Sequence, residues 1–273
     1  MLLDHGVNAA LEFAFQSGRL TPEGAKMLRS RRFIALKAYV ATLLHRYPAV
    51  FSVASKLLYK IDRSFATLSP GAPAAIDDAM ARVSRDGPPG DYYEFGVFRG
   101  FTLLAAQQSA KARGLDRMRF NGFDSFEGLP PIEGIDADGR FFEGQFACSM
   151  NAVSLNLKRH GADMSRISLT KGFFSDSLTE SLKAQPGFGP AAIAFVDCDL
   201  YSSTRDVLCW LESLLQDGSL VLMDDWYSFG DNAELGQQKA FAEFLERTGV
   251  WEAEPIGEFK LHGKAFRLRR KAD

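Results

Sequence analysis

The sequence has few of the residues that mark a disulfide-bonded, zinc-binding or membrane protein. Its three cysteines show no paired spacing, and with only four histidines they form no Cys/His cluster. No apolar run approaches the roughly 20 residues needed to cross a bilayer. The N-terminus lacks a basic region followed by an apolar core and a cleavage site. We therefore expect a cytoplasmic protein with reduced thiols and no stable membrane insertion.

A large excess of one charge is also absent. The 32 basic and 34 acidic residues leave a formal net charge of -2, which gives no reason to expect nucleic acid or an acidic membrane as a partner. The composition is ordinary for a globular protein, because 46% of the 273 residues are hydrophobic. That length suits one α/β domain with an additional segment.

The pattern along the chain changes near Gly90. Residues 1–88 are typical of helices, with stretches expected at about 21–47 and 74–83. We expect this extension to form a homodimer or higher homo-oligomer, or to cover the substrate. A basic amphipathic helix on a membrane surface, around residues 29–37, is the alternative.

Residues 89–273 alternate short apolar runs with helical stretches. Strands are expected at 92–95, 119–123, 167–170, 192–196 and 219–223, and a closing hairpin at 251–256 and 264–268. Helices are expected between them at 101–113, 150–160, 175–184, 203–215 and 234–247. Strands that are apolar throughout pair in parallel and are buried on both faces. The sequence therefore predicts an α/β fold with a doubly wound, mostly parallel seven-stranded, Rossmann-like sheet.

The ends of the first two strands carry candidate ligand-binding residues, because ligands of such sheets bind beyond the carboxyl ends of the strands. Glycines at Gly96 and Gly100 allow a tight turn and a close approach to a ligand, although a purely structural turn also explains them. Glu94 can accept a hydrogen bond from an ammonium group. Asp124 can bind the ribose of a nicotinamide cofactor or of adenosylmethionine, or it can cap a turn.

The third strand is followed by Gly172, Phe173 and Phe174. Aromatic rings beside a glycine can stack on an adenine. Core packing explains two phenylalanines equally well, since the chain contains 23 of them.

Two pairs of aspartates follow the fourth and fifth strands. Asp197 and Asp199 come after the fourth strand, and Asp224 and Asp225 follow the fifth. Four carboxylates at neighbouring strand ends repel one another unless a positive charge lies between them. Hard oxygen ligands suit Mg²⁺, Mn²⁺ or Ca²⁺, so we predict a metal site of Asp197, Asp224 and Asp225. Extended geometry would turn Asp199 to the other side. The alternative is that these aspartates only cap turns and the next helix.

Together these segments resemble the macrocin O-methyltransferase (TylF-type) family, whose members methylate sugar hydroxyls of natural products. The resemblance runs from about residue 91 to 246, and its segments are 94–100, 123–130, 144–149, 171–174, 197–204 and 224–226. The D-S-F-E-G-L-P run and the D-x-D-L-Y-x-S-T run are the most specific. The resemblance implies a class I methyltransferase fold, S-adenosylmethionine as methyl donor, and Mg²⁺ (or Mn²⁺) at the aspartates.

The resemblance also implies roles for single residues. Glu94 and Gly96 would hold the methionine end, Asp124 the ribose, and Gly172 with Phe174 the adenine. Further cofactor-binding candidates in the same motifs are Val97, Arg99, Ser125, Phe173 and Asp197.

The chemistry then follows from the charges. A hydroxyl bound to Mg²⁺ loses its proton more easily, and Asp197 or Asp199 can relay that proton. The sequence does not choose between these two catalytic candidates. Asp199-Leu200 stands where metal-dependent catechol and caffeoyl-CoA methyltransferases typically carry a lysine base. This difference favours a sugar or another small polyhydroxylated acceptor over a phenol.

Two other classes of function stay open. A nicotinamide-dependent oxidoreductase would use Asp124, but the third glycine of its motif and a Tyr-x-x-x-Lys pair are missing. A non-catalytic adenosylmethionine-binding protein would leave the strand-end carboxylates without a use. The long segment 131–147 is expected to cover the substrate with Arg140, Phe141 and Phe142, or to be a mobile surface excursion.

Overall fold

The computed structural model describes residues 71–137, 141–259 and 262–271. The helix expected at 21–47 and the roles expected for the N-terminal region lie outside these residues, apart from its last helix. Within the described ranges, no helix is long and apolar enough to cross a membrane.

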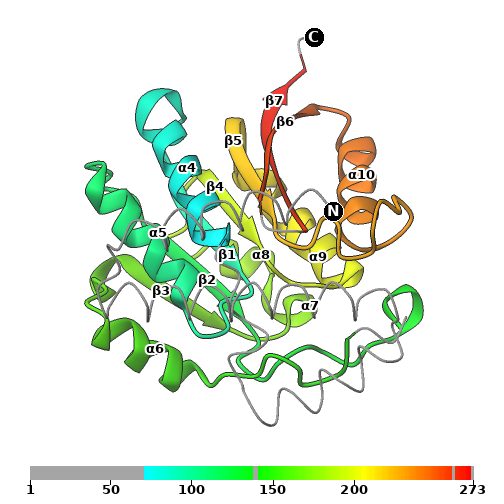
Figure 1. Ribbon diagram of the computed structural model, residues 1–273, viewed down its shortest axis with the longest axis horizontal. Coiled ribbons are helices and arrows are strands. Elements are labelled where there is room, and N and C mark those ends of the chain that lie inside the picture. Colours follow the sequence, from blue (N-terminus) through cyan, green and yellow to red (C-terminus); the bar gives the residue numbers. More distant parts are fainter. Residues whose placement is uncertain (1–70, 138–140, 260–261, 272–273) are drawn as a thin grey trace, which may run out of the picture. The chain divides into compact units, whose positions relative to one another are not determined.

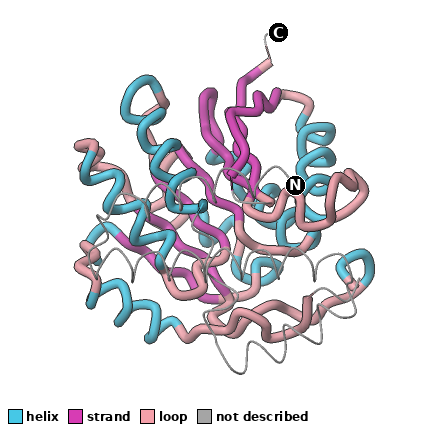
Figure 2. The backbone as a smooth tube through the Cα atoms, viewed as in Figure 1, coloured by secondary structure: helices cyan, strands magenta, loops and turns pink. Residues whose placement is uncertain are grey.

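One seven-stranded sheet, with helices on both faces, forms the described domain (Figures 1 and 2). Its strands are β1 (Asp91–Phe95), β2 (Phe120–Asp124), β3 (Ile167–Lys171), β4 (Ala191–Val196), β5 (Leu215–Met223), β6 (Trp251–Phe259) and β7 (Gly263–Arg270). Its α-helices are α4 (Gly71–Asp86), α5 (Phe101–Ala112), α6 (Met150–Arg159), α7 (Phe174–Ser177), α8 (Glu180–Lys183), α9 (Tyr201–Leu211) and α10 (Gly236–Thr248).

The strand order is β3-β2-β1-β4-β5-β7-β6. Strands β1 to β5 are parallel, whereas β7 runs antiparallel to both of its neighbours. The predicted fold class is therefore confirmed, including the closing hairpin. From β1 the chain first builds the sheet toward β3 and then continues on the other side with β4. This change of direction places the switch point, where ligands of such sheets bind, between β1 and β4.

Strand β1 shows how the sequence produces two buried faces. All five of its residues are buried. Tyr92 packs in a core cluster with residues of α4 and α5. Tyr93 and Phe95 pack on the opposite face, in a second cluster with residues of α9 and α10. Because side chains alternate between faces and helices cover both, an apolar residue is favoured at nearly every position of the strand.

Helix α4 lies within the N-terminal region expected at 1–88, yet it packs on the sheet domain. Ile76 and Met80 are fully buried in the core cluster of α5 and β1. Asp77 accepts hydrogen bonds from Arg113, the residue directly after α5, at 2.7 and 2.9 Å, and these bonds hold the pKa of Asp77 below its usual value. The last helix of that region is thus part of the same core.

Several helix boundaries differ from the sequence expectation, most clearly between β3 and β5. The helix expected at 175–184 is two short helices, α7 and α8, because the Thr179 side chain accepts a hydrogen bond from Leu182 N and starts a new helix. The helix expected at 203–215 begins at Tyr201 and ends at Leu211, and β5 already begins at Leu215.

Candidate active site

The carboxyl ends of the parallel strands meet at one edge of the sheet. Backbone hydrogen bonds continue the ladder by one step at the strand junctions, among them Gly96 N to Phe123 O (2.9 Å), Asp197 N to Phe95 O (2.8 Å) and Asp224 N to Val196 O (3.0 Å). The residues that the sequence places after β1, β4 and β5 are therefore direct neighbours in space.

Asp197, Asp224 and Asp225 form a compact group of carboxylates, the acidic cluster. One oxygen of each lies within 4.8 Å of the others. Asp224 is 3% exposed, and the other two are half-buried. Two negative charges at about 5 Å repel by about 3 kcal/mol at an effective dielectric constant of about 20. Three carboxylate oxygens are a donor set that fits Mg²⁺ or Mn²⁺, with water or an acceptor oxygen completing the coordination.

Asp199 lies in a tight turn directly after β4. It adopts the left-handed conformation with φ 60°, and Leu200 N donates to Cys198 O at 2.6 Å around it. Such a conformation costs a residue other than glycine about 1–2 kcal/mol. Asp199 N also donates to Asp225 Oδ2 at 3.1 Å. Strand geometry ends before this residue, so the condition under which Asp199 would point to the other side is not met.

Asp136, a buried carboxylate in the long loop after β2, has a role that was not predicted from the sequence. It is 3% exposed, and its oxygens accept hydrogen bonds from Tyr201 N (2.7 Å) and Ser202 N (3.1 Å). These amides belong to the first turn of α9, where backbone N–H groups lack partners within the helix. Asp136 therefore caps α9 from another segment. No local motif reveals this role, because 65 residues separate Asp136 from Tyr201.

The long loop is fastened at its base. Leu129 N donates to Gln145 O, and Gly144 N donates to Leu129 O, both at 2.9 Å. Gln145 is 3% exposed. The two ends of the excursion are thus joined by backbone bonds as in a short ladder.

An aromatic residue of the same loop packs inward. Phe141 is 8% exposed and forms a small hydrophobic cluster with Leu200 and Phe229. Phe142 is half-buried, and Arg140 lies outside the described residues. The described part of the loop is therefore packed against the ends of β4 and β5, and Phe141 serves that packing.

The turn after β1 is fixed by a close approach. Gly96 has φ 92°, and a Cβ at this position would lie 1.7 Å from Asp197 O. Only glycine lets the ends of β1 and β4 come this close. Just before it, Glu94 is fully buried and accepts hydrogen bonds from Tyr92 Oη (2.6 Å) and Thr102 Oγ1 (2.8 Å).

Burial raises the pKa of Glu94 to about 8, although its two hydroxyl partners oppose the rise. The carboxyl has no exposed surface in this structure. Its binding of a cofactor ammonium stays a prediction.

Asp124 anchors the turn after β1 from the end of β2. Its Oδ2 accepts hydrogen bonds from Val97 N (2.9 Å) and Phe98 N (2.8 Å), and its Oδ1 accepts one from Phe126 N (2.6 Å). Burial raises the pKa of Asp124, and the three amides oppose that rise. A hydrogen bond with the Ser125 side chain also opposes the rise, so most acceptor positions of this carboxylate are used within the turn. Asp124 therefore caps the turns after β1 and β2, which was one of its two predicted roles. Ribose binding stays a prediction.

The other cofactor candidates near β1 and β2 make structural contacts at the same edge. Val97 is 2% exposed. Ser125 Oγ donates to Gly128 O at 2.6 Å, which closes the turn after β2. The Arg99 guanidinium lies 5.0 Å from the centre of the Phe98 ring.

At the end of β3, Gly172 has φ 147°, and Phe173 precedes the first residue of α7. The Phe174 ring lies 6.0 Å from the Phe95 ring and packs against the core. The core-packing alternative thus describes Phe174 in this structure. Adenine binding by these residues stays a prediction.

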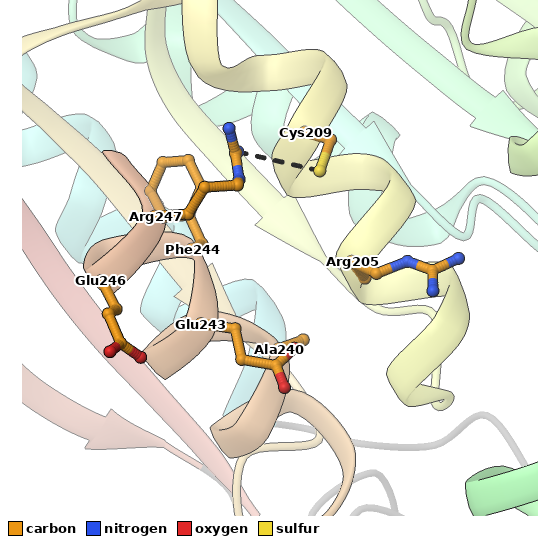
Figure 3. A pocket seen from close by; sticks show the side chains of 7 residues that line it. All are labelled: Arg205, Cys209, Ala240, Glu243, Phe244, Glu246 and Arg247. Atoms are coloured by element: carbon orange, nitrogen blue, oxygen red, sulfur yellow. Dashed lines mark hydrogen bonds between the residues drawn. The ribbon is translucent and has the colours of Figure 1, made fainter. Parts of the chain in front are cut away.

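A groove of about 310 Å³ lies elsewhere, between α9 and α10 (Figure 3). Its lining residues are Arg205, Cys209, Ala240, Glu243, Phe244, Glu246 and Arg247. Arg247 donates a hydrogen bond to the Cys209 sulfur at 3.7 Å. None of the lining residues comes from a strand end, so this groove is separate from the candidate site.

The chain is similar to known O-methyltransferases over most of its length. The family model described as Macrocin-O-methyltransferase (TylF) matches residues 74–267. The chain is 34% identical over 193 residues to 8-demethyl-8-(2,3-dimethoxy-alpha-L-rhamnosyl)-tetracenomycin-C 4'-O-methyltransferase of Streptomyces olivaceus, covering 68% of both chains. It is 29% identical to mycinamicin III 3''-O-methyltransferase of Micromonospora griseorubida, over 55% of this chain and 61% of the relative.

Solved structures share the fold. The O-methyltransferase NovP superposes with a TM-score of 0.61 at 22% identity, over 73% of this chain and 79% of NovP. The calicheamicin methyltransferase CalS11 gives a TM-score of 0.57 at 22% identity, over 91% of this chain and 94% of CalS11. With the family model matching most of the sequence, the chain belongs to the macrocin O-methyltransferase (TylF) family and is an S-adenosylmethionine-dependent O-methyltransferase.

Proposed function

We propose that the protein methylates a hydroxyl of a sugar or another small polyhydroxylated natural product, and that it does so with Mg²⁺ or Mn²⁺ bound by Asp197, Asp224 and Asp225. The observation that carries this proposal is the acidic cluster, which lies at the switch-point edge beside the turn after β1. Relatives named for a rhamnosyl-tetracenomycin and for mycinamicin support a glycosylated acceptor.

A divalent cation in the acidic cluster would supply the positive charge that lowers the pKa of an acceptor hydroxyl and fixes its direction. Asp197, as a ligand, loses proton affinity to the same positive charge. Asp199 lies beside the cluster but outside the three ligands, in a turn that Asp225 holds through Asp199 N. We therefore assign the proton acceptor to the Asp199 carboxylate, and ligand duty to Asp197.

The methyl donor would bind over the ends of β1 to β3. Gly96 lets the turn after β1 lie close against the end of β4, and the α5 N-terminus follows at Phe101, where partial positive charge favours a carboxylate. Asp124, at the end of β2, would accept a hydrogen bond from a ribose hydroxyl. Positioning of donor and acceptor supplies much of the rate in such transfers, on the order of 7–11 kcal/mol in favourable intramolecular cases.

Calorimetry with S-adenosylmethionine, S-adenosylhomocysteine and NAD, each with Mg²⁺ and with chelator, tests the donor site. We expect the adenosyl ligands to bind and NAD not to bind. Binding of NAD alone would overturn the proposal in favour of an oxidoreductase.

Methyl transfer to a panel of glycosides, free sugars and phenols then tests the acceptor class and the metal. Asp224→Asn should abolish the Mg²⁺-dependent transfer. Asp231→Asn, an exposed aspartate in the same β5–α10 segment, is the matched control and should retain it. Equal activity of the wild type with Mg²⁺ and with chelator would show that the metal assignment is wrong.

A further inference from the structure

Gln237, in the first turn of α10, joins the two strand ends that carry the acidic cluster. It is 1% exposed. Its Oε1 accepts a hydrogen bond from Asp225 N at 3.0 Å, and its Nε2 donates to Val196 O at 3.0 Å. Val196 is the last residue of β4 and directly precedes Asp197. One neutral side chain therefore bonds to the backbone on both sides of the cluster.

The side-chain amide of Gln237 bridges the two strands just beyond the point where their direct pairing ends. The β4–β5 register ends with Val196 opposite Met223, and Asp224 N makes the last direct bond to Val196 O. The next amide of the chain, Asp225 N, donates to Gln237. The Gln237 amide, which carries one acceptor and one donor group, thus bridges Asp225 N and Val196 O beyond the end of the ladder.

The Gln237 bridge lies where electrostatic repulsion favours separation of the strand ends. The three carboxylates of the cluster repel one another, and the repulsion would move Asp225 away from Asp197. A lysine or arginine could oppose this movement, but its charge would compete with a cation. Gln237 ties the backbone together and adds no charge.

We propose that Gln237 is a positioning residue that holds Asp197 and Asp225 at the spacing required by a divalent cation. This inference rests on the metal site of the proposed function. Residues that orient metal ligands in this way typically change metal affinity when they are replaced, even though they do not touch the ion.

The neighbouring Gln238 provides a matched control. It is 8% exposed, lies in the same helical turn, and donates to Trp226 O (2.9 Å) and Gly230 O (3.0 Å). Replacing it also removes two buried hydrogen bonds, but these bonds do not join β4 to β5. The two positions therefore separate a loss of strand spacing from a general loss of buried contacts.

The experiment compares Mn²⁺ binding to the metal-free full chain in Gln237→Met, Gln238→Met and the wild type, followed by electron paramagnetic resonance. We expect the Kd for Mn²⁺ to rise about 10–100-fold in Gln237→Met and to stay within about threefold of the wild type in Gln238→Met. Thermal unfolding and the Kd for S-adenosylmethionine are measured on the same samples. Both variants should show similar thermal midpoints and wild-type cofactor affinity.

A second variant guards against a folding defect of the first. Gln237→Asn keeps the amide but is one methylene too short to span both partners, so it should also weaken Mn²⁺ binding. Equal Mn²⁺ affinity in Gln237→Asn and the wild type, or equal losses in Gln237→Met and Gln238→Met, would overturn the inference. If the wild type itself bound no Mn²⁺, the metal site of the proposed function would be wrong, and this inference would fall with it.

Discussion

Removal of one carboxylate from the acidic cluster should not destabilise the protein in chelator, but it should destabilise the protein when a divalent cation is bound. Asp224 is the best position for this test, because it is 3% exposed and its charge is the least screened of the three. Asp224→Asn keeps the size of the side chain and removes one negative charge. In chelator, we expect the variant to be as stable as the wild type or more stable.

The magnitude follows from the geometry of the cluster. Each of the two repulsions that Asp224 makes, at separations of up to 4.8 Å, amounts to about 3 kcal/mol at an effective dielectric constant of about 20. Relaxation of the half-buried partners and lost hydrogen bonds reduce the net gain to about 1 kcal/mol. A cation at about one hundred times its Kd stabilises the wild type by about 2.7 kcal/mol, which the variant loses.

Urea unfolding, in chelator and in saturating Mg²⁺ or Mn²⁺, measures both quantities in the same protein. In chelator the variant should be at least as stable as the wild type, and with the cation it should be less stable. Asp231→Asn should follow the wild type under both conditions. Equal stabilisation of all three proteins by the cation would refute the reasoning, as would strong destabilisation of Asp224→Asn in chelator.

Three further perturbations test other parts of the site. Burial raises the pKa of Glu94 from 4.5 to about 8. The contribution of this protonated carboxyl to the free energy of unfolding is therefore fully present below about pH 4.5 and is lost as the pH rises through 8. Glu94→Gln should remove a pH dependence on the order of 5 kcal/mol, seen as a flatter profile of unfolding free energy between those pH values, and an unchanged profile would contradict the burial argument. Asp136→Asn should cost about 1–2 kcal/mol in urea unfolding, because the new NH₂ group faces the Ser202 amide in place of an acceptor, whereas a loss near zero would show that the cap is unimportant. Gly96→Ala should cost more than about 3 kcal/mol and abolish S-adenosylmethionine binding in calorimetry, since its Cβ would lie 1.7 Å from Asp197 O, and retained binding would mean that the turn adapts.

The sheet could be predicted because its strands are short apolar runs between helices. The second strand, expected at 119–123, is observed at 120–124. The start of β5 was missed because Asp217 and Gly218 are typical of a turn. In the structure Gly218 has φ 88° and Gln216 N donates to the Ser219 side chain, so the strand continues through an irregular step. The break at Thr179 is also a side-chain effect that helical periodicity does not contain.

The strand-end residues could be placed at one edge because topology alone brings carboxyl ends together. Their proximity in the acidic cluster needed only that the strands carrying Asp197 and Asp224 be neighbours. Asp136 and Gln237 were not predicted, since each acts through contacts with residues far away in the sequence. The direction of the Asp199 side chain could not be derived from strand alternation, because Asp199 itself adopts a left-handed conformation that interrupts the strand geometry.

The acidic cluster is supported from two sides by segments that lie outside the parallel strands. The loop after β2 reaches α9 through Asp136 and packs on Leu200, and α10 reaches β4 and β5 through Gln237. Loops at this edge are where such folds vary to select substrates. The same loop that would face the acceptor therefore also helps to hold the turn of Asp199. We expect replacement of residues 131–137 by a relative's loop to change Mn²⁺ affinity together with acceptor preference, unless Asp136 and its cap on α9 are preserved.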